Sequence, residues 1–409
     1  MANTNDTFPP ELLRRPAKER LQYFASKVVA HPRLLEAYQS LLKVVDNPCG
    51  ATLVIVCGPT GVGKTTMRLR TEHYLIEAAQ AEMARDLRHV PVVSVEVSPP
   101  EGQAFSWKDL YRRMLMALHE PPMLVTQKTL VKINAAEVSD VSVPNQSSAI
   151  PAAARAWSSL DLRWALERSI RERRPSAILI DEAQHLNRVM GARSLQQQMD
   201  VLKSLASATG VLHVLIGTYE LLNMLNLSGQ LARRSVEIHF PRYRADDEQE
   251  MDMFANVVFT FERHLPLVKT PDLVAQCEFL YEGSAGCVGT LKNWLARAYA
   301  RALDGDSRTL TRHHLEQTLD RRKQMQIARE ILEGEETLRA LPASQQQLRG
   351  LLGMDLPATQ TPESSVNGTP IKANDSTKSV RKSQRSRPAG QRLPKRDPVG
   401  RGPVGSQGT

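Results

Sequence analysis

The chain has few of the features that define several large classes of protein. Its four cysteines, at positions 49, 57, 277 and 287, form no Cys-x-x-Cys pair, so neither a disulfide framework nor a cysteine-based metal site is expected. No apolar run approaches the roughly 18 residues that a membrane span needs. The residues after Met1 lack a basic and then apolar leader, so we expect no signal peptide and no membrane partner.

An excess of charge of either sign is also missing from most of the chain. The formal net charge is +9, but residues 370–409 hold 10 Lys/Arg and 2 Asp, and the other 369 residues hold 43 Lys/Arg and 42 Asp/Glu. The basic balance therefore belongs to the C-terminal tail. Residues 341–409 are rich in Gln, Pro, Ser and Gly and have too little apolar surface to fold alone, so we predict a disordered basic tail.

The most specific motif that is present lies at residues 58–65, with the sequence Gly-Pro-Thr-Gly-Val-Gly-Lys-Thr. It follows an apolar, β-branched run at 51–57 and precedes a segment with helical spacing at 66–80. A glycine-rich turn between a strand and a helix presents backbone N–H groups to phosphates. Lys64 would reach the β- and γ-phosphates of ATP, and the Thr65 hydroxyl would be a ligand of Mg²⁺.

A second motif supplies the carboxylates that such a site needs. Residues 176–186 form an apolar run of strand type that ends in Asp181-Glu182, and ligands bind at the carboxyl ends of such strands. Asp181 would hold Mg²⁺, and Glu182 would position and polarise the attacking water. The predicted nucleotide-binding residues are Gly58, Pro59, Thr60, Gly61, Val62, Gly63, Lys64, Thr65, Thr66 and Asp181.

Strand-like and helix-like segments alternate along the first 240 residues, which predicts an α/β fold with a doubly wound parallel sheet and helices on both faces. The expected strands are 51–57, 89–97, 176–181 and 211–218, and the expected helices are 16–45 (broken at His31-Pro32), 66–80, 106–118, 161–174 and 199–209. After residue 247 we expect helices only, at 248–261, 271–281, 289–303 and 311–322.

These patterns predict a division into domains. Residues 1–15 would be a flexible arm, 16–245 a nucleotide-binding α/β domain, 246–340 a small all-α domain and 341–409 the tail. Residues 119–156 hold four prolines and few periodic apolar residues, so they are interpreted as a long loop or insertion.

Two further segments have candidate roles in catalysis. Thr218 ends the strand that follows Asp181-Glu182 along the chain; its hydroxyl either contacts the γ-phosphate or its water, or satisfies a turn. Arg233 and Arg234 precede a further predicted strand within residues 231–241. The two arginines either act in trans on the γ-phosphate of a neighbouring protomer or form a solvated pair.

Together these segments resemble the AAA+ ATPases, and within them the TniB/TnsC family of transposition target-selection ATPases, which are relatives of the phage Mu B protein. The resemblance covers roughly residues 16–320. It rests on the leader at 20–33, GPTGVGKT at 58–65, ILIDEAQHL at 178–186, LIGT at 215–218, LARRSVEIHFPRY at 231–243 and GCVGTLKNWL at 286–295. The chain departs from the AAA+ pattern in having no arginine at the usual second-sensor position of the helical lid, where Lys292 is the nearest cation.

The resemblance implies a slow, regulatory ATPase in the bacterial cytoplasm. Such a protein forms a ring or helical filament with ATP on duplex DNA, marks the target site and recruits or activates a transposase, and hydrolysis drives disassembly. A target-selection protein or complex would be its other partner. ATP would lie between protomers, with Arg233 or Arg234 supplied by the neighbour.

Several interpretations stay open for the DNA-binding surface and for the tail. The resemblance places the helix after the second strand against DNA, where Lys108, Arg112 and Arg113 would contact phosphates without sequence preference; the alternative is an ordinary solvated helix face. The tail would bind DNA nonspecifically, dock on a transposase or targeting subunit, or serve only solubility.

Other functions remain alternatives at this stage. One is a DNA-linked ATPase of the initiator or helicase-loader type. A winged-helix domain after the lid would favour it, but residues 323–355 are too few and 356–409 too polar to form one. Another is a partner-dependent, ATP-locked scaffold, which would have no need of the carboxylate at Glu182.

Overall fold

The structure is a computed structural model in which two units are distinguished, Met1–Ala343 and Ser344–Thr409. It describes residues 7–99, 105–119, 158–187, 192–222, 234–340, 349–350 and 352–354. The predicted insertion at 119–156 and nearly all of the tail thus lie outside the described residues. The boundaries predicted within the first unit stay a prediction.

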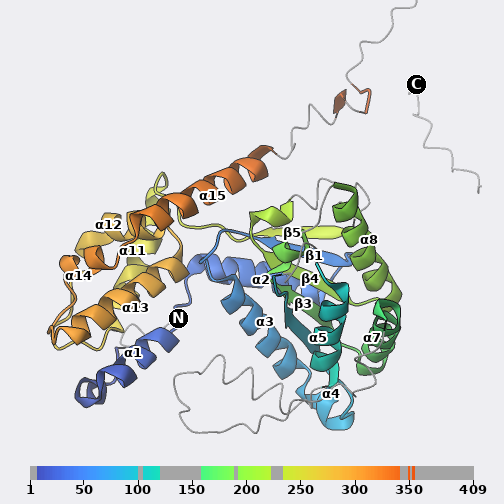
Figure 1. Cartoon of the computed structure of the whole chain (residues 1–409), viewed down its shortest axis with the longest axis horizontal. Coiled ribbons are helices and arrows are strands. Elements are labelled where there is room, and N and C mark those ends of the chain that lie inside the picture. The colour runs from blue at the N-terminus through green and yellow to red at the C-terminus, as the bar shows by residue number, and fades with distance from the viewer. Residues whose placement is uncertain are drawn as a thin grey trace, which may run out of the picture. The chain divides into compact units, whose positions relative to one another are not determined.

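A five-stranded parallel sheet is the centre of the first unit, as the sequence predicts (Figure 1). Its strands are β1 (Leu53–Cys57), β2 (Val92–Glu96), β3 (Ala177–Asp181), β4 (Leu212–Gly217) and β5 (Ser235–His239). The spatial order is β2-β3-β4-β1-β5. Since β1 lies between β4 and β5 and β3 lies beside β4, the loops after β1, β3 and β4 meet at one edge.

Helices cover both faces of this sheet because alternate strand residues point to opposite sides. Ile55, Ile180 and Leu215 pack with α5 (Trp107–His119), α7 (Ser159–Arg173) and α8 (Ala192–Thr209). Val54, Leu179 and Val214 pack with α2 (Pro32–Asp46) and α3 (Lys64–Ala78) on the other face. A short helix, α4 (Gln80–Arg85), follows α3.

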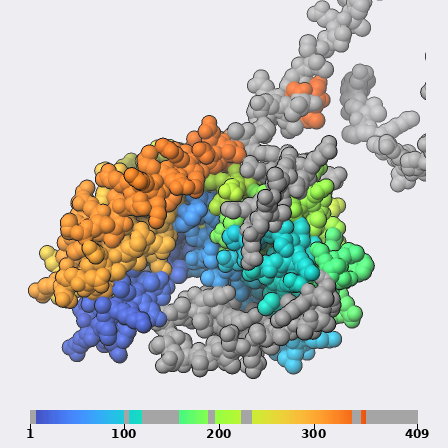
Figure 2. Space-filling model, in the orientation of Figure 1, coloured from blue at the N-terminus to red at the C-terminus, as the bar shows by residue number. Residues whose placement is uncertain are grey.

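A separate apolar core belongs to the helices that follow β5. These are α11 (Glu248–Arg263), α12 (Cys277–Ser284), α13 (Val288–Asp304) and α14 (Arg312–Gln317), with a 3-10 turn η5 (Val274–Gln276). Trp294 and Phe261 are buried in this core, and Phe24 of α1 (Ala17–Ser26) joins them. We call α11–α14 the lid. Figure 2 shows α1, in blue, beside the lid helices, in orange.

The structure differs from the predicted element boundaries at several points. Residues Pro10–Arg14 form a 3-10 helix, η1, where a flexible arm is predicted, because Pro10 fixes a helix-compatible φ at the first turn. Helix α8 begins at Ala192 rather than 199, and α12 begins at Cys277 rather than 271. None of the helices in the described ranges is long and apolar enough to cross a membrane.

The longest difference is α15 (Arg321–Ala340), which the sequence analysis did not predict as a helix of its own. It packs back on the sheet domain, where Gly334 lies so close to the Tyr219 ring that a side chain at 334 would overlap it. Glu335 accepts two hydrogen bonds from the Arg242 guanidinium, at 2.8 and 3.2 Å. Helix α15 therefore connects the lid to the ends of β4 and β5.

Candidate active site

The loop between β1 and α3 has the backbone of a phosphate cradle. Gly61 and Gly63 have φ values of +84° and +113°, which side-chain-bearing residues adopt at a cost. These conformations end the loop so that α3 begins directly at Lys64. The N-terminus of a 15-residue helix therefore faces the loop, and it favours an anion.

Lys64 lies at the base of this loop and is almost fully buried. Its Nζ donates hydrogen bonds to the carbonyl oxygens of Gly58 and Pro59, at 2.9 and 2.8 Å. Burial lowers the pKa of Lys64, and the nearby charges of Glu182 and Asp181 oppose that shift. The Lys64 ammonium is thus at the loop and near both predicted carboxylates. The next residue, Thr65, is exposed.

The two carboxylates lie at the end of β3. Asp181 is 2% exposed, and its Oδ1 accepts a hydrogen bond from the backbone N–H of Glu182 at 3.0 Å. Glu182 has φ +53°, a left-handed conformation for a residue other than glycine. Strained backbone of this kind concentrates at functional sites. The hydroxyl of Thr65 and one carboxylate are ligands that suit Mg²⁺ beside a phosphate.

Arg68 is a member of this site that the sequence analysis missed. It lies one helical turn after Lys64, and its Nε donates to Asp181 Oδ2 at 3.0 Å. Its guanidinium also bonds Glu72 at 3.3 Å and the Ser94 hydroxyl. Arg68, Asp181 and Glu72 are all less than 10% exposed. Arg68 thus neutralises two buried carboxylates, and it orients the one predicted to hold Mg²⁺.

Gln184 is a second residue that the sequence did not identify. It lies in a 3-10 turn, η3 (Ala183–Asn187), and its Nε2 donates to Glu182 Oε2 at 2.5 Å. Its Oε1 accepts the backbone N–H of Thr218 at 3.3 Å. The Thr218 Oγ1 is buried and has no partner among the described residues. The hydroxyl is therefore available for a ligand, and a satisfied turn hydroxyl does not describe this geometry.

Of the predicted arginine pair, only Arg234 is within the described residues, and Arg233 lies outside them. The Arg234 side chain is exposed, and its carbonyl accepts the N–H groups of Thr52 and Leu53 at the start of β1. Arg234 thus precedes β5 at its amino end, and the phosphate loop follows β1 at its carboxyl end. Because the two strands are parallel, Arg234 and Lys64 lie at opposite edges of the sheet. Any contact of Arg234 with a γ-phosphate would therefore be in another protomer.

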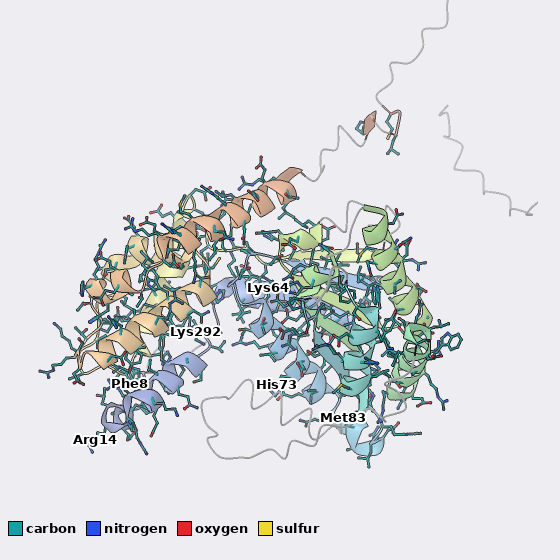
Figure 3. The ribbon with its side chains drawn as sticks, viewed as in Figure 1. Phe8, Arg14, Lys64, His73, Met83 and Lys292 are labelled. Carbon is teal, nitrogen blue, oxygen red and sulfur yellow. The ribbon has the colours of Figure 1, made fainter. Side chains whose placement is uncertain are left out.

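The lid contacts the phosphate loop directly. The backbone N–H of Gly289, in the first turn of α13, donates to the carbonyl of Gly61 at 2.6 Å. Lys292 follows within the same helix, and Figure 3 labels it together with Lys64. Burial lowers the pKa of Lys292, and it forms no ion pair with another described residue. Lys292 is thus the lid cation nearest to this contact along the chain.

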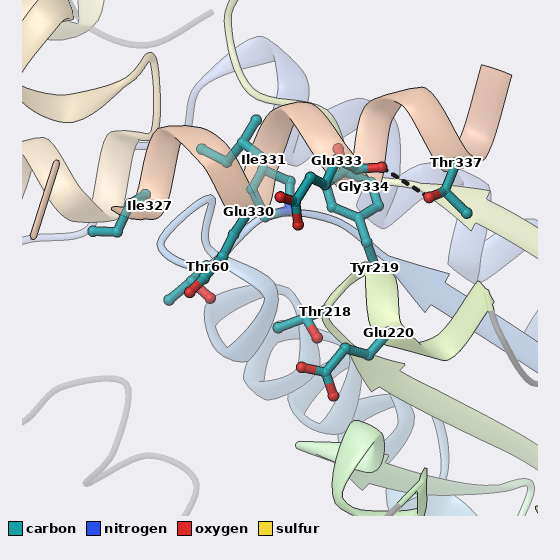
Figure 4. Close-up of a pocket in the computed structure, with 11 residues that line it drawn as sticks. Thr60, Thr218, Tyr219, Glu220, Ile327, Glu330, Ile331, Glu333, Gly334 and Thr337 are labelled. Atoms are coloured by element: carbon teal, nitrogen blue, oxygen red, sulfur yellow. Dashed lines mark hydrogen bonds between the residues drawn. The ribbon is translucent and has the colours of Figure 1, made fainter. Parts of the chain in front are cut away.

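A pocket of about 290 Å³ lies beside the loop. Pro59 and Thr60 form one side, Thr218 and Glu220 another, and α15 the third (Figure 4). The α15 residues that line it are Ile327, Glu330, Ile331, Glu333, Gly334 and Thr337. Thr218, whose buried hydroxyl has no partner among the described residues, thus lines the same pocket as the phosphate loop.

The predicted DNA-binding residues lie on α5, on the edge of the sheet domain next to β2. Arg113 is exposed, and its Nε donates to Asp109 at 2.7 Å, whereas Lys108 and Arg112 are partly buried. Tyr111 of the same helix is 2% exposed within the core. The face carries positive charge, part of which Asp109 neutralises.

A family model and several solved structures are similar to parts of this chain. Residues 49–225 match the family model of an AAA domain, whereas no curated protein matches the chain. Similar solved structures include the Aeropyrum pernix ORC2 protein (13% identity, TM-score 0.43, covering 72% of this chain and 70% of that one). Others are a Walker-type ATPase of Pyrococcus abyssi (16%, 0.41, 74% and 74%) and domain III of the Thermotoga maritima replication initiation protein DnaA (13%, 0.33, 76% and 97%).

All of these TM-scores are below 0.5, so the fold is assigned from the sheet and loops described above and not from these structures. The family match begins just before β1 and ends just after η4 (Tyr219–Leu221). It therefore contains the phosphate loop, Asp181, Glu182 and Thr218. Residues 49–225 of this chain thus match the AAA domain model over these parts of the candidate site.

Proposed function

We propose that this chain is an ATP-dependent regulator of transposition of the TniB/TnsC type, which assembles on duplex DNA with ATP and disassembles on hydrolysis. The observation that carries the ATPase part is the meeting of three strand ends. The phosphate loop follows β1, Asp181 and Glu182 end β3, and Thr218 follows β4, and these three strands are neighbours in the sheet.

Each residue has a role in hydrolysis that follows from its position. Lys64 and the loop N–H groups hold the phosphates, and Glu182 directs the water toward the γ-phosphate. The free Thr218 hydroxyl contacts that phosphate or the water. Thr65 and Asp181 would hold Mg²⁺, which would neutralise phosphate charge when bound.

The assembly part of the proposal follows from the position of Arg234. It precedes β5 at its amino end, whereas the phosphate loop follows β1 at its carboxyl end, so Arg234 cannot reach the γ-phosphate of its own protomer. An arginine from a neighbouring protomer, Arg233 or Arg234, would complete the charge stabilisation. This supports a ring or filament in which ATP lies between protomers.

The transposition part rests on the family-like segments around this core, from the leader at 20–33 to the lid sequence at 286–295. The leader and the lid share one apolar core through Phe24, and lid residue Gly289 bonds the phosphate loop. Nucleotide state would therefore reach the segments that carry the narrower resemblance. The transposase and the target-selection partner would bind the assembled form.

The first test is negative-stain imaging with duplex DNA and either ATP-γ-S or ADP. We expect rings or filaments on DNA with the ATP analogue only, and none with Lys64→Ala, which should lose nucleotide binding. Lys43→Ala, on exposed surface of α2, is the matched control. Monomers in both nucleotide states would contradict the proposal and favour a helicase loader or a partner-dependent ATPase.

The DNA surface is tested separately by reversing charge on α5. Lys108→Glu with Arg112→Glu should weaken DNA binding and reduce its salt dependence, because phosphate contacts release counterions. The control pair is Arg168→Glu with Arg171→Glu, on the exposed surface of α7, which makes the same change in charge elsewhere. If both pairs weakened DNA binding equally, α5 would not be the DNA-binding surface.

A further inference from the structure

A single buried amide joins the end of β3 to the end of β4. Gln184 is 7% exposed, and it uses both ends of its amide within the site. Nε2 donates to the Glu182 carboxylate at 2.5 Å, and Oε1 accepts from the Thr218 N–H at 3.3 Å. The residue proposed to direct water and the residue proposed to contact the γ-phosphate thus share one hydrogen-bonded link.

The backbone at Glu182 gives this link a specific geometry. With φ +53°, Glu182 turns the chain sharply as it leaves β3, and a left-handed residue of this kind persists only where its surroundings hold it. Three bonds do so here: its N–H donates to Asp181 Oδ1 at 3.0 Å, its carbonyl accepts the His185 N–H at 3.1 Å, and its carboxylate accepts from Gln184. The position of the carboxylate therefore depends on the amide.

The other end of the link depends on a missing side chain. A Cβ built on Gly217 would overlap Gln184 Oε1 and approach the Gln184 backbone N to 3.2 Å. A side chain at 217 and the observed amide therefore exclude one another. Gly217 is the last residue of β4. Its lack of a side chain leaves space at the strand end for the Gln184 amide to reach Thr218.

We propose that Gln184 is a positioning residue for hydrolysis, which sets the Glu182 carboxylate according to the position of Thr218. This inference rests on the proposed ATPase activity. When Thr218 contacts the terminal phosphate, its N–H moves with it, and the amide carries that movement to Glu182. No covalent step involves Gln184, and it does not touch the nucleotide.

The test separates the two ends of the amide. Gln184→Glu keeps an oxygen for the Thr218 N–H but loses the donor to Glu182, whereas Gln184→Ala loses both. Gly217→Ala displaces the amide from the opposite side. Gln324→Ala is the matched control, because Gln324 also donates from a partly buried amide, to the carbonyl of Gly283 in the lid.

The measurements are the affinity for a fluorescent ADP, the kcat and KM of ATP hydrolysis, and thermal unfolding. We expect kcat to fall by about tenfold to a hundredfold in all three site variants, as for a misplaced catalytic group. Nucleotide affinity and the unfolding midpoint should stay close to those of Gln324→Ala. Unchanged kcat, or a parallel loss of nucleotide affinity, would overturn the inference.

A double-variant comparison excludes a merely structural role. If Gln184 acts through Glu182, adding Gln184→Ala to Glu182→Gln should change the residual single-turnover rate by less than about twofold. The same fractional loss in both backgrounds would show that Gln184 acts on something else.

A readout without hydrolysis keeps the inference distinct from the proposed function. Hydrogen exchange of the peptide that contains Thr218 should slow when ATP-γ-S binds wild type, and should not slow in Gln184→Ala that binds the analogue equally well. Equal protection in both proteins would overturn the inference alone. A wild-type protein that binds no nucleotide would instead overturn the proposed function.

Discussion

The backbone N–H of Gly289 donates a hydrogen bond of 2.6 Å to the carbonyl of Gly61. One glycine begins a lid helix and the other lies in the phosphate loop, 228 positions earlier in the chain. The approach is close on both sides, because a Cβ on Gly289 would lie 2.7 Å from the Gly61 oxygen. This contact makes the position of the lid depend on the conformation of the loop.

Gly289→Ala should therefore weaken nucleotide binding without destabilising the lid. Alanine favours the helix, by roughly 1 kcal/mol relative to glycine, but its Cβ must push α13 away from the loop. We expect the Kd for ADP to rise about tenfold, which corresponds to roughly 1.4 kcal/mol. Gly305→Ala at the other end of α13, where a Cβ has no neighbour closer than 3.7 Å, should leave the Kd unchanged; a similar loss there would contradict the prediction.

Glu182→Gln should hold the assembled state. The amide keeps the size of the side chain but cannot serve as a base, so ATP binds and hydrolysis slows by at least about a hundredfold. DNA-bound assemblies formed with ATP should then last as long as those formed with ATP-γ-S. Light scattering after dilution measures their lifetime. If Glu182→Gln assemblies dissociated faster than wild type on ATP, the role given to Glu182 would be wrong.

Arg68→Ala should destabilise the sheet domain strongly. It would remove the guanidinium that pairs with both buried carboxylates, Asp181 and Glu72, and breaking a buried pair costs about 3–5 kcal/mol. Arg68→Lys should cost less, because it keeps the charge but not the geometry of the guanidinium. Urea unfolding measures both. Arg168→Ala, in an exposed pair with Glu172, should change little, and equal losses at 68 and 168 would be inconsistent with a central role for Arg68.

Stability should fall as the pH is lowered from 7 to 5, and His213 should account for part of the loss. His213 is buried on β4, and burial lowers its pKa to about 4. The unfolded chain, with a histidine pKa of about 6.5, then binds more protons than the native state. The contribution is intact above about pH 6.5 and decreases toward pH 4, by up to about 2 kcal/mol at pH 5.

The variant His213→Leu isolates that contribution. It removes the titrating ring from the core, so the difference in unfolding free energy between pH 7 and pH 5 should become smaller than in wild type. The remaining difference would include His31, whose pKa burial also lowers to about 4. A pH dependence identical to that of wild type would assign the effect to other groups.

The sheet and the candidate site at its edge could be predicted from the sequence because both depend on local patterns. The segments that form β1, β3 and β4 are largely apolar runs, as expected for strands buried on both faces, and these three strands are buried throughout. The polar residues that follow such runs come together at one edge for topological reasons. Lys64, Asp181, Glu182 and Thr218 could thus be placed without knowledge of side-chain contacts.

The residues that were missed depend on long-range contacts. Arg68 is one arginine in a helix of mixed charge, and only its bond to Asp181, 113 positions away, identifies it. Its place one turn after Lys64 was the available signal. Gln184 acquires a role only because Gly217 leaves room for its amide. Helix α15 is rich in Arg, Glu and Gln. It contacts the sheet domain through a few apolar side chains, such as Ile331, and through Gly334, which its charged sequence does not single out.

Helix α15 also has a mechanical consequence. Its 20 residues span about 30 Å at 1.5 Å per residue, and its later half contacts Tyr219 through Gly334 and Arg242 through Glu335. The next residues in the chain after Ala340 begin the predicted tail. A pulling force on the chain beyond Ala340 would therefore act on α15 and, at Gly334, on Tyr219. Because Tyr219 is one residue from Thr218, such a force would strain the chain where β4 ends at the candidate active site.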